Sequence, residues 1–184
     1  MEFKVATNII FSVHVGMWDV DKYKSFSMPP RDITQQIFSE LVFSRCLTKA
    51  SLKAFRDCAL QDVLLGDYPR VKDRWMDVIA SQGSSLLSAD LSGSAVIDTG
   101  LGCLKDCTNL EALTFNYCDR ISECGLKYIS GLTNLTSLSL KKSNIITAAG
   151  MHVFFQLSKL GKVRHGEMLG DSGWIRAHQR FNET

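Results

Sequence analysis

A leucine recurs through the middle of this 184-residue chain at a nearly constant interval. The positions are Leu60, Leu86, Leu110, Leu135 and Leu160, so the successive intervals are 26, 24, 25 and 25 residues. A repeat of this length is typical of a solenoid, in which each unit buries its apolar side chains only by stacking on its neighbours. The period therefore favours an extended binding surface over a catalytic pocket.

Each unit contains two segments with different apolar periods. In the clearest unit, Leu113 and Phe115 alternate with polar or small residues, which places both on one face of a short strand. Gly125 then precedes Leu126 and Ile129, whose spacing suits one face of a helical turn. One strand and one helix per unit predict an α/β fold, a short right-handed solenoid with parallel strands on the concave face and helices outside.

The register of the repeat can be followed beyond the clearest unit. Ser122 and Thr147 lie three residues before the glycines of their units, where a hydroxyl group can cap the start of a helix. Trp75 stands where the later units carry glycine, and Leu47 begins a stretch that matches the second half of a unit. We expect repeats over residues 47–163.

The unit at residues 110–126 has the pattern L-x-x-L-x-F-x-x-C-x-x-I-S-x-x-G-L. This pattern resembles the cysteine-containing subfamily of leucine-rich repeats, which is best known from the substrate-binding half of F-box proteins. Plant leucine-rich proteins of the F-box type are similar over residues 28–160. Cys118 alone supplies the subfamily cysteine, and Tyr68, Ser94 and Ser143 occupy its place in the other units.

The segment ahead of the repeats is similar to the opening of an F-box. Residues 28–41 read MPPRDITQQIFSEL, close to the family pattern of a proline, an acidic residue, Ile-Phe and a final leucine. In that family the helix docks on a Skp-type adaptor, which links the protein to a cullin ubiquitin ligase. The resemblance therefore implies an adaptor-binding surface made by four apolar side chains, Ile33, Ile37, Phe38 and Leu41.

The match to an F-box is incomplete. The family motif continues through two further helices, whereas here the repeat register already begins at Leu47 and Trp75 belongs to a repeat. The alternative is a helix that caps the first repeat by covering its open apolar edge, as terminal repeats require. Residues 28–46 are thus either an F-box-like helix or a capping helix, and one helix could do both.

The two ends of the chain fall outside the repeat pattern. We expect an irregular extension over residues 1–27 and a divergent tail over residues 164–184, because the tail lacks the repeat phrase. An array that stops within a unit exposes its last apolar flank, here including Met151 and Phe154, unless something covers it. A truncated isoform of a longer repeat protein is therefore one interpretation of the chain.

Composition and charge exclude several classes of partner. The net charge of +2 is spread along the chain without a basic face, so nucleic acid is not an expected partner. The apolar stretch at residues 5–15 is too short and too polar to span a membrane. Protein partners remain the expected class.

The reactive side chains do not form a recognisable catalytic or metal-binding motif. The six cysteines include no C-x-x-C pair and have no histidine close by in sequence, which favours free, buried thiols in the cytoplasm or nucleus. No phosphate-binding glycine loop, G-x-S-x-G or H-E-x-x-H motif occurs. We therefore expect no enzyme activity, no cofactor and no bound metal.

The repeat geometry indicates which residues face a partner. On each strand the side chains between the buried ones point to the concave face. The stripe is hydroxyl-rich and nearly neutral, and its candidate partner-binding residues are Asp62, Ser88, Asp90, Ser92, Thr114, Asn116, Ser137, Ser139 and Lys141.

These patterns lead to one functional hypothesis with two alternatives. The leading hypothesis is a protein-binding module that recognises a degradation substrate for an SCF-type ubiquitin ligase, with a Skp-type adaptor at the N-terminal helix. One alternative is a non-catalytic interaction scaffold without a ligase link. The other is the truncated isoform described above.

Overall fold

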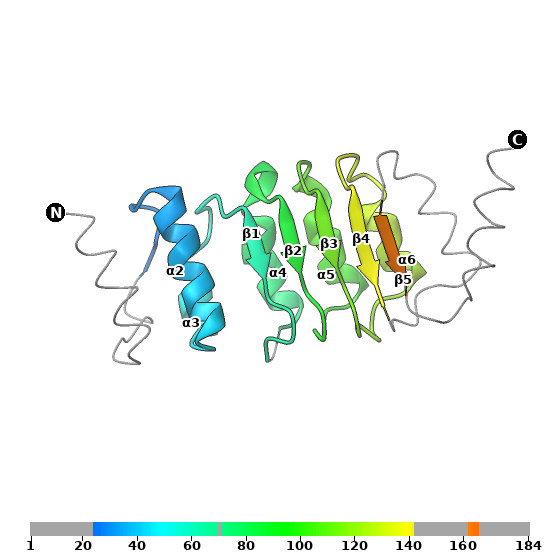
Figure 1. Cartoon of the computed structure of the whole chain (residues 1–184), viewed down its shortest axis with the longest axis horizontal. Coiled ribbons are helices and arrows are strands. Elements are labelled where there is room, and N and C mark those ends of the chain that lie inside the picture. Colours follow the sequence, from blue (N-terminus) through cyan, green and yellow to red (C-terminus); the bar gives the residue numbers. More distant parts are fainter. Residues whose placement is uncertain (1–23, 70, 142–161, 166–184) are drawn as a thin grey trace, which may run out of the picture.

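A single parallel sheet forms one side of the molecule (Figure 1). The computed structural model describes residues 24–69, 71–141 and 162–165. The strands pair in the order of the sequence, and every pair is parallel. They are β1 (Asp62–Leu64), β2 (Ser88–Asp90), β3 (Ala112–Thr114), β4 (Ser137–Leu140) and β5 (Lys162–His165).

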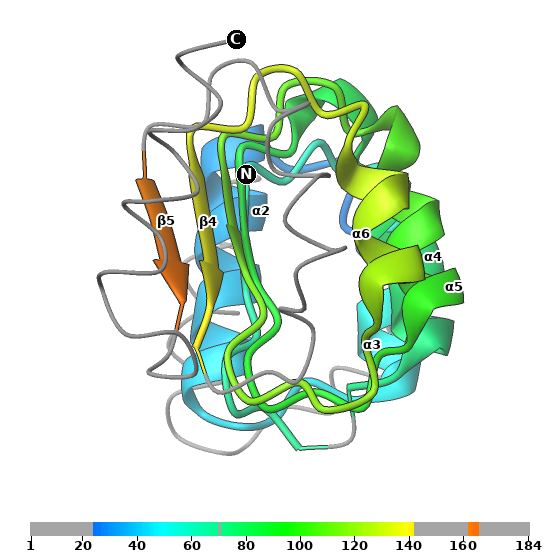
Figure 2. The same cartoon turned by 90° about the vertical axis from the view of Figure 1, so that its right-hand side faces the viewer.

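Helices alternate with the strands and form the opposite layer (Figure 2). This layer contains α4 (Asp73–Ala80), α5 (Asp98–Gly102), α6 (Glu123–Ile129) and the 3-10 helices η2 (Gly83–Ser85) and η3 (Cys103–Asp106). The predicted α/β fold of one strand and one helix per unit is therefore confirmed. The chain is a solenoid of the leucine-rich-repeat type.

The apolar positions of the repeat form one continuous core between the two layers. Leu86, Leu110 and Leu135 are fully buried, as are the strand residues Leu113 and Leu138. Leu160 and the predicted helix with Ile146, Thr147, Gly150, Met151 and Phe154 lie outside the described residues, as do residues 1–23 and 166–184. Burial of the same position in successive units explains why the leucine period is so regular.

Aspartates hold successive units together on the helix side of the array. The Asp98 carboxylate accepts hydrogen bonds from the backbone N–H and the hydroxyl of Ser122, at 2.7 and 2.6 Å. One unit earlier, Asp73 accepts from the backbone N–H of Ile97 at 2.9 Å and from the hydroxyl of Thr99 at 3.0 Å. Each carboxylate thus fixes the turn that opens the next helix, and Ser122 caps α6 as predicted.

The repeat glycines leave room for these aspartates. A Cβ atom on Gly100 would lie 2.7 Å from the nearer Asp73 carboxylate oxygen, and one on Gly125 would collide with Asp98. The first unit follows the N-terminal cap instead of a complete repeat, and the same position there is Trp75. Its ring packs on Tyr68 with the centroids 5.8 Å apart. Glycine is therefore needed only where a preceding aspartate reaches into the unit.

Two helices close the N-terminal end of the core. Helix α2 (Arg31–Phe43) lies beside β1 in the strand layer, and the short α3 (Lys49–Lys53) lies in the helix layer (Figures 1 and 2). Pro30 precedes α2, where its fixed φ suits a helix start, and Asp32 lies in the first turn. The Thr48 hydroxyl caps α3. The cap thus takes the place of one complete unit.

Aromatic side chains pack this cap onto the first repeat. Phe55 stacks on Phe26 with the ring centroids 4.6 Å apart and meets Phe38 edge-on at 5.2 Å. Ile37 and Leu41 are fully buried in the same cluster. Phe26, in the segment expected to be irregular, also donates its backbone N–H to Ala54 at 2.8 Å. The core therefore begins ahead of α2.

Candidate functional site

The strand register arranges the predicted partner-binding residues in two rows. One row contains Asp62, Ser88, Ala112 and Ser137, and the other contains Leu64, Asp90, Thr114 and Ser139. Their side chains alternate with the buried positions, so both rows lie on the outer surface of the sheet. We call this surface, together with the adjoining side of α2, the strand face.

Most of the predicted residues are accessible on the strand face, but two are not. Asp62 and Lys141 are exposed, and Ser88, Asp90, Thr114, Asn116 and Ser137 are half-buried. Ser92 and Ser139 retain only 8% of their accessible surface. The expectation that these two serines contact a partner is therefore corrected, since neighbouring side chains already cover them.

The hydroxyl groups of the two buried serines donate hydrogen bonds to side chains of neighbouring residues. Asp90 Oδ1 accepts from the hydroxyl of Ser92 at 2.6 Å and from its backbone N–H at 2.9 Å. Asn116 Oδ1 accepts from the Ser139 hydroxyl and from the backbone N–H of Lys141, both at 2.8 Å. Asp90 and Asn116 therefore stabilise the turns after their strands, in addition to presenting polar atoms at the surface.

An apolar groove lies between α2 and β1 on the strand face. Its volume is about 250 Å³, and it is lined by Phe38, Ser39, Val42, Phe43 and Leu64. Phe43 is 80% exposed and Leu64 is 55% exposed, which is unusual for side chains of this size. We call this feature the end groove.

The end groove was missed by the sequence analysis. Phe43 lies one residue beyond the apolar stripe of its helix, and Leu64 occupies an outward position of its strand. The signal that could have found it was the apolar side chain of Leu64 in a stripe otherwise made of small or polar residues.

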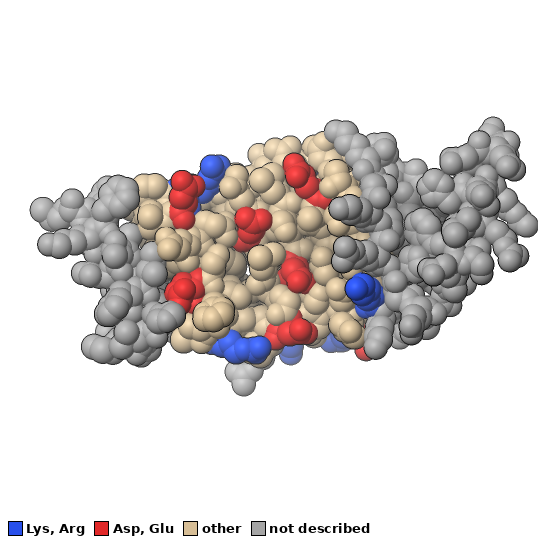
Figure 3. All heavy atoms as spheres, in the orientation of Figure 1, with Lys and Arg blue, Asp and Glu red and all other residues tan. Residues whose placement is uncertain are grey.

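Negative charge surrounds the end groove. Figure 3 shows acidic side chains distributed over the face formed by α2 and the strands, with Lys and Arg side chains at its rim. Asp62 and Asp90 stand on β1 and β2, and Glu40 stands on α2. The stripe predicted to be nearly neutral is thus acidic at its N-terminal end.

The residues implied by the F-box resemblance face the other way. Ile37, Phe38 and Leu41 expose 0%, 1% and 0% of their surfaces, and Ile33 packs partly buried against the same core. An adaptor could not reach the first three without displacing them from the first repeat. Their expected role as adaptor contacts is therefore corrected to that of packing residues of the cap.

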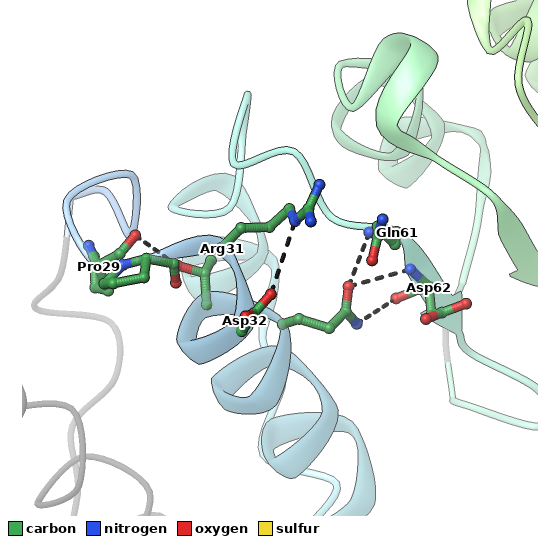
Figure 4. Close-up of polar contacts among 8 residues, drawn as sticks. Pro29, Arg31, Asp32, Gln61 and Asp62 are labelled. Carbon is green, nitrogen blue, oxygen red and sulfur yellow. Dashed lines mark hydrogen bonds and ion pairs between the residues drawn. The ribbon is translucent and has the colours of Figure 1, made fainter.

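A polar side chain of α2 completes the edge of the sheet. Gln35 Oε1 accepts from the backbone N–H groups of Gln61 and Asp62 at 2.9 and 3.1 Å, and Gln35 Nε2 donates to the Asp62 carbonyl at 2.8 Å (Figure 4). At the next strand, the Gln61 carbonyl accepts from Leu87 and Ser88 in the same manner. The glutamine amide thus replaces the peptide group of an absent strand.

The cysteines are free thiols with different environments. Cys58, Cys107 and Cys118 are buried as expected, whereas Cys46 and Cys124 are exposed and Cys103 is intermediate. Burial raises the pKa of the Cys118 thiol, which donates to the Leu91 carbonyl at 3.3 Å. Burial also raises the pKa of Cys107, to about 11. These buried thiols are protonated near neutral pH and are poor nucleophiles.

The described part of the chain has neither a cluster of metal ligands nor a membrane-spanning helix. Within it, no three His, Cys, Asp or Glu side chains are placed to hold a metal ion together. None of its helices has the length and apolar character needed to cross a membrane.

Comparisons with known proteins add no family name. No protein-family model matches the sequence, and no curated protein matches it. Similar solved structures include actin-binding site 2 of leiomodin-1, at 13% identity over 96% of both chains and a TM-score of 0.45. An internalin from Listeria monocytogenes str. 4b F2365 matches 71% of this chain and 57% of its own, at 13% identity and a TM-score of 0.28. The fold assignment rests on this chain's own parallel ladder and repeat period.

Proposed function

We propose that this chain is a non-catalytic protein-binding module whose strand face is the binding surface. The observation that carries the proposal is the end groove, where Phe43 and Leu64 remain exposed beside an ordered apolar floor. Protein interfaces commonly centre on a few large side chains inserted into such depressions and surrounded by polar groups. Half-buried Ser88, Thr114 and Ser137 on β2–β4, with Asn116 just after β3, extend the same face with polar side chains.

The charge around the groove defines the partner that fits it. Asp62 is exposed next to the groove, and Glu40 and Asp90 lie on the flanking elements. Carboxylates on this surface favour a partner with Lys or Arg, both by steering its approach and by opposing acidic competitors. The occupant we propose is therefore a protein segment with one large apolar anchor flanked by basic residues.

A comparison of two matched variants tests the strand face. Phe43→Ser combined with Leu64→Ser removes the apolar walls of the end groove, whereas Tyr128→Ser removes an exposed aromatic side chain from α6 in the helix layer. Some proteins will bind the immobilised wild-type chain. Their affinity for the first variant should be at least about tenfold lower, because interface anchors contribute more than about 2 kcal/mol. They should be retained by the second variant. Equal retention by both folded variants would refute the proposal.

Substrate recognition for an SCF-type ubiquitin ligase is a second proposal. It is supported by the F-box-like sequence of residues 28–41 and by Met28, which is 80% exposed just ahead of α2. Because the inner side of α2 is buried, a Skp-type adaptor would have to bind Met28 and the outer side of the helix.

A direct binding measurement with a purified Skp-type adaptor tests the ligase proposal. Wild-type chain should bind it, and Met28→Ser should weaken binding, with Tyr128→Ser as the control. Adaptor at about 100 µM would reveal a binding free energy as weak as about −5.5 kcal/mol. If the folded wild-type chain does not bind at that concentration, the ligase proposal is refuted.

A further inference from the structure

A second hollow lies where the N-terminal cap meets the first repeat. Its volume is about 440 Å³, larger than that of the end groove, and the two share no lining residue. We call it the basic pocket. It is lined by Arg45, Leu47, Thr48, Lys49, Tyr68, Pro69, Arg74 and Trp75.

Three exposed cationic residues contribute to the lining of the basic pocket. Arg45 follows α2, Lys49 begins α3 and Arg74 lies in the first turn of α4. None of the described residues that line the pocket is Asp or Glu. Among residues 24–69 and 71–141, no side-chain hydrogen bond or ion pair engages any of these three cations.

The floor of the pocket is fixed. Tyr68 and Trp75 pack ring on ring and expose 6% and 5% of their surfaces. The Tyr68 hydroxyl donates to the Leu47 carbonyl at 2.9 Å, which ties the loop after β1 to the cap. A ligand would therefore meet a pocket whose apolar floor is already formed.

The backbone at Arg45 is strained. Its φ of 56° lies in the left-handed region, which asparagine and glycine adopt far more readily than arginine. The backbone N–H of Arg45 bonds the Val42 carbonyl at 3.1 Å, so the turn that ends α2 holds this conformation.

We propose that the basic pocket binds the phosphate monoester of a phosphorylated protein side chain. A phosphate monoester carries close to two negative charges near neutral pH and three acceptor oxygens, which suits a pocket lined by three cationic residues better than a single carboxylate does. Arginine guanidinium groups bind phosphate through paired N–H donors. The apolar floor gives the carbon atoms that carry the phosphate a surface to contact.

The arrangement fits a single phosphate better than a nucleic acid strand. A polynucleotide needs a track of cations along its backbone, whereas the adjoining strand face is acidic (Figure 3). The proposal does not depend on the strand face being a binding surface, because the basic pocket and the end groove are separate.

A titration of the full ¹⁵N-labelled chain with a minimal peptide tests the proposal. The probe is acetyl-Gly-Gly-phosphoserine-Gly-Gly-amide, and the control is its unphosphorylated twin. The phosphopeptide should shift the Trp75 indole N–H resonance and the Lys49 amide resonance by NMR, and the twin should leave both unchanged. Inorganic phosphate should compete for the same resonances.

Two double variants with the same change in net charge make the result specific. Arg45→Gln with Arg74→Gln should weaken phosphopeptide binding at least about tenfold, since each charge-assisted hydrogen bond contributes on that scale. Lys105→Gln with Lys127→Gln removes two exposed cations from η3 and α6 and should leave the affinity unchanged. If the first pair unfolds the chain, Lys49→Gln with Arg74→Gln replaces it.

Three outcomes would overturn the proposal. One is the absence of any Trp75 shift at about 10 mM phosphopeptide, above the weakest specific affinities. Another is an equal loss of affinity in the Lys105 and Lys127 variant, which would indicate diffuse charge attraction. The third is tighter binding of an oligouridylate at the same resonances. The Phe43→Ser, Leu64→Ser variant should still bind the phosphopeptide, so failure of the strand-face proposal is distinguishable from failure of this one.

Discussion

The side chain of Gln35 pairs with the backbone of Asp62 through both ends of its amide group. Gln35 Oε1 accepts the Asp62 N–H at 3.1 Å, and Gln35 Nε2 donates to the Asp62 carbonyl at 2.8 Å. The first strand of the array therefore has hydrogen-bond partners on its outer edge, although no strand precedes it among the described residues. Exposed strand edges promote pairing with other chains, and a helix beside the edge reduces that hazard.

Removal of this amide should destabilise the chain. Gln35→Ala leaves the N–H groups of Gln61 and Asp62 without their acceptor, and we expect a loss of about 1–3 kcal/mol in the free energy of unfolding. Gln36→Ala, one residue along on the exposed side of α2, should change it by less than about 0.5 kcal/mol. Urea denaturation followed by circular dichroism measures both. Equal stability of the two variants would show that the edge is satisfied by water.

Substitution of the two phenylalanines of α2 should have different effects on stability. Phe38→Ala removes a buried ring from the Phe55 cluster and should cost about 3–5 kcal/mol. Phe43→Ala removes an exposed ring and should leave the melting temperature almost unchanged. Thermal denaturation of both variants distinguishes a packing helix from a helix that presents its apolar stripe outward. A mild effect of Phe38→Ala would favour the outward orientation.

The glycine of the third unit should tolerate no side chain while its aspartate neighbour is present. Gly125→Ala places a methyl group against Asp98 and should destabilise the chain by about 1–3 kcal/mol. Gly102→Ala is the control, because its Cβ would lie 3.4 Å from the Tyr128 ring, an ordinary contact. A double-mutant cycle with Asp98→Ala should recover part of the Gly125→Ala loss. Strict additivity would mean that the carboxylate does not set the need for glycine.

The rate at which each cysteine is labelled should depend on how deeply its thiol is buried. At pH 8, maleimide should label Cys46 and Cys124 quickly in the folded chain and leave Cys58, Cys107 and Cys118 unlabelled until denaturant is added, as measured by mass spectrometry. Rapid labelling of Cys118 would contradict the buried position.

The buried thiol of Cys107 should make the folded chain less stable as the pH rises into the alkaline range. Its pKa is raised from 9.0 to about 11, chiefly by burial and then by the charges of Asp106 and Cys103. The unfolded chain therefore releases this proton at lower pH than the folded chain does. The stabilising contribution is present below about pH 9 and is lost as the pH rises toward 11. Cys107→Ala should flatten the fall in stability over that range, and an unchanged slope would contradict this origin.

The solenoid was predictable because its signals are local and repeated. Alternation at Leu113 and Phe115 specified the strand, and the Gly125 phrase specified the helix, since each pattern depends on residues a few positions apart. The glycine–aspartate contacts were also encoded, because Gly100 follows Asp73 by 27 residues and Gly125 follows Asp98 by 27. The sequence alone did not pair Asp98 with Gly125, because only the stacking of units brings the two residues together.

The candidate site was less predictable for a related reason. Period-two alternation correctly put Asp62 and Lys141 at the surface, but it could not show that Ser92 and Ser139 are covered by neighbouring side chains. The end groove and the basic pocket each combine the cap with the first repeat. Their geometry depends on how α2 and α3 dock against β1 and α4, which no periodicity within one segment specifies.

The constant aspartate-to-glycine spacing has a consequence for how such a chain can change over generations. At two junctions of the described array, a unit reaches forward to the next through an aspartate that packs against a glycine, so these two junctions are chemically alike. Duplication or deletion of one whole unit would rebuild an equivalent junction without new core residues. Gain or loss of a whole unit can therefore change the length of the array in steps while the cap at its N-terminal end stays the same.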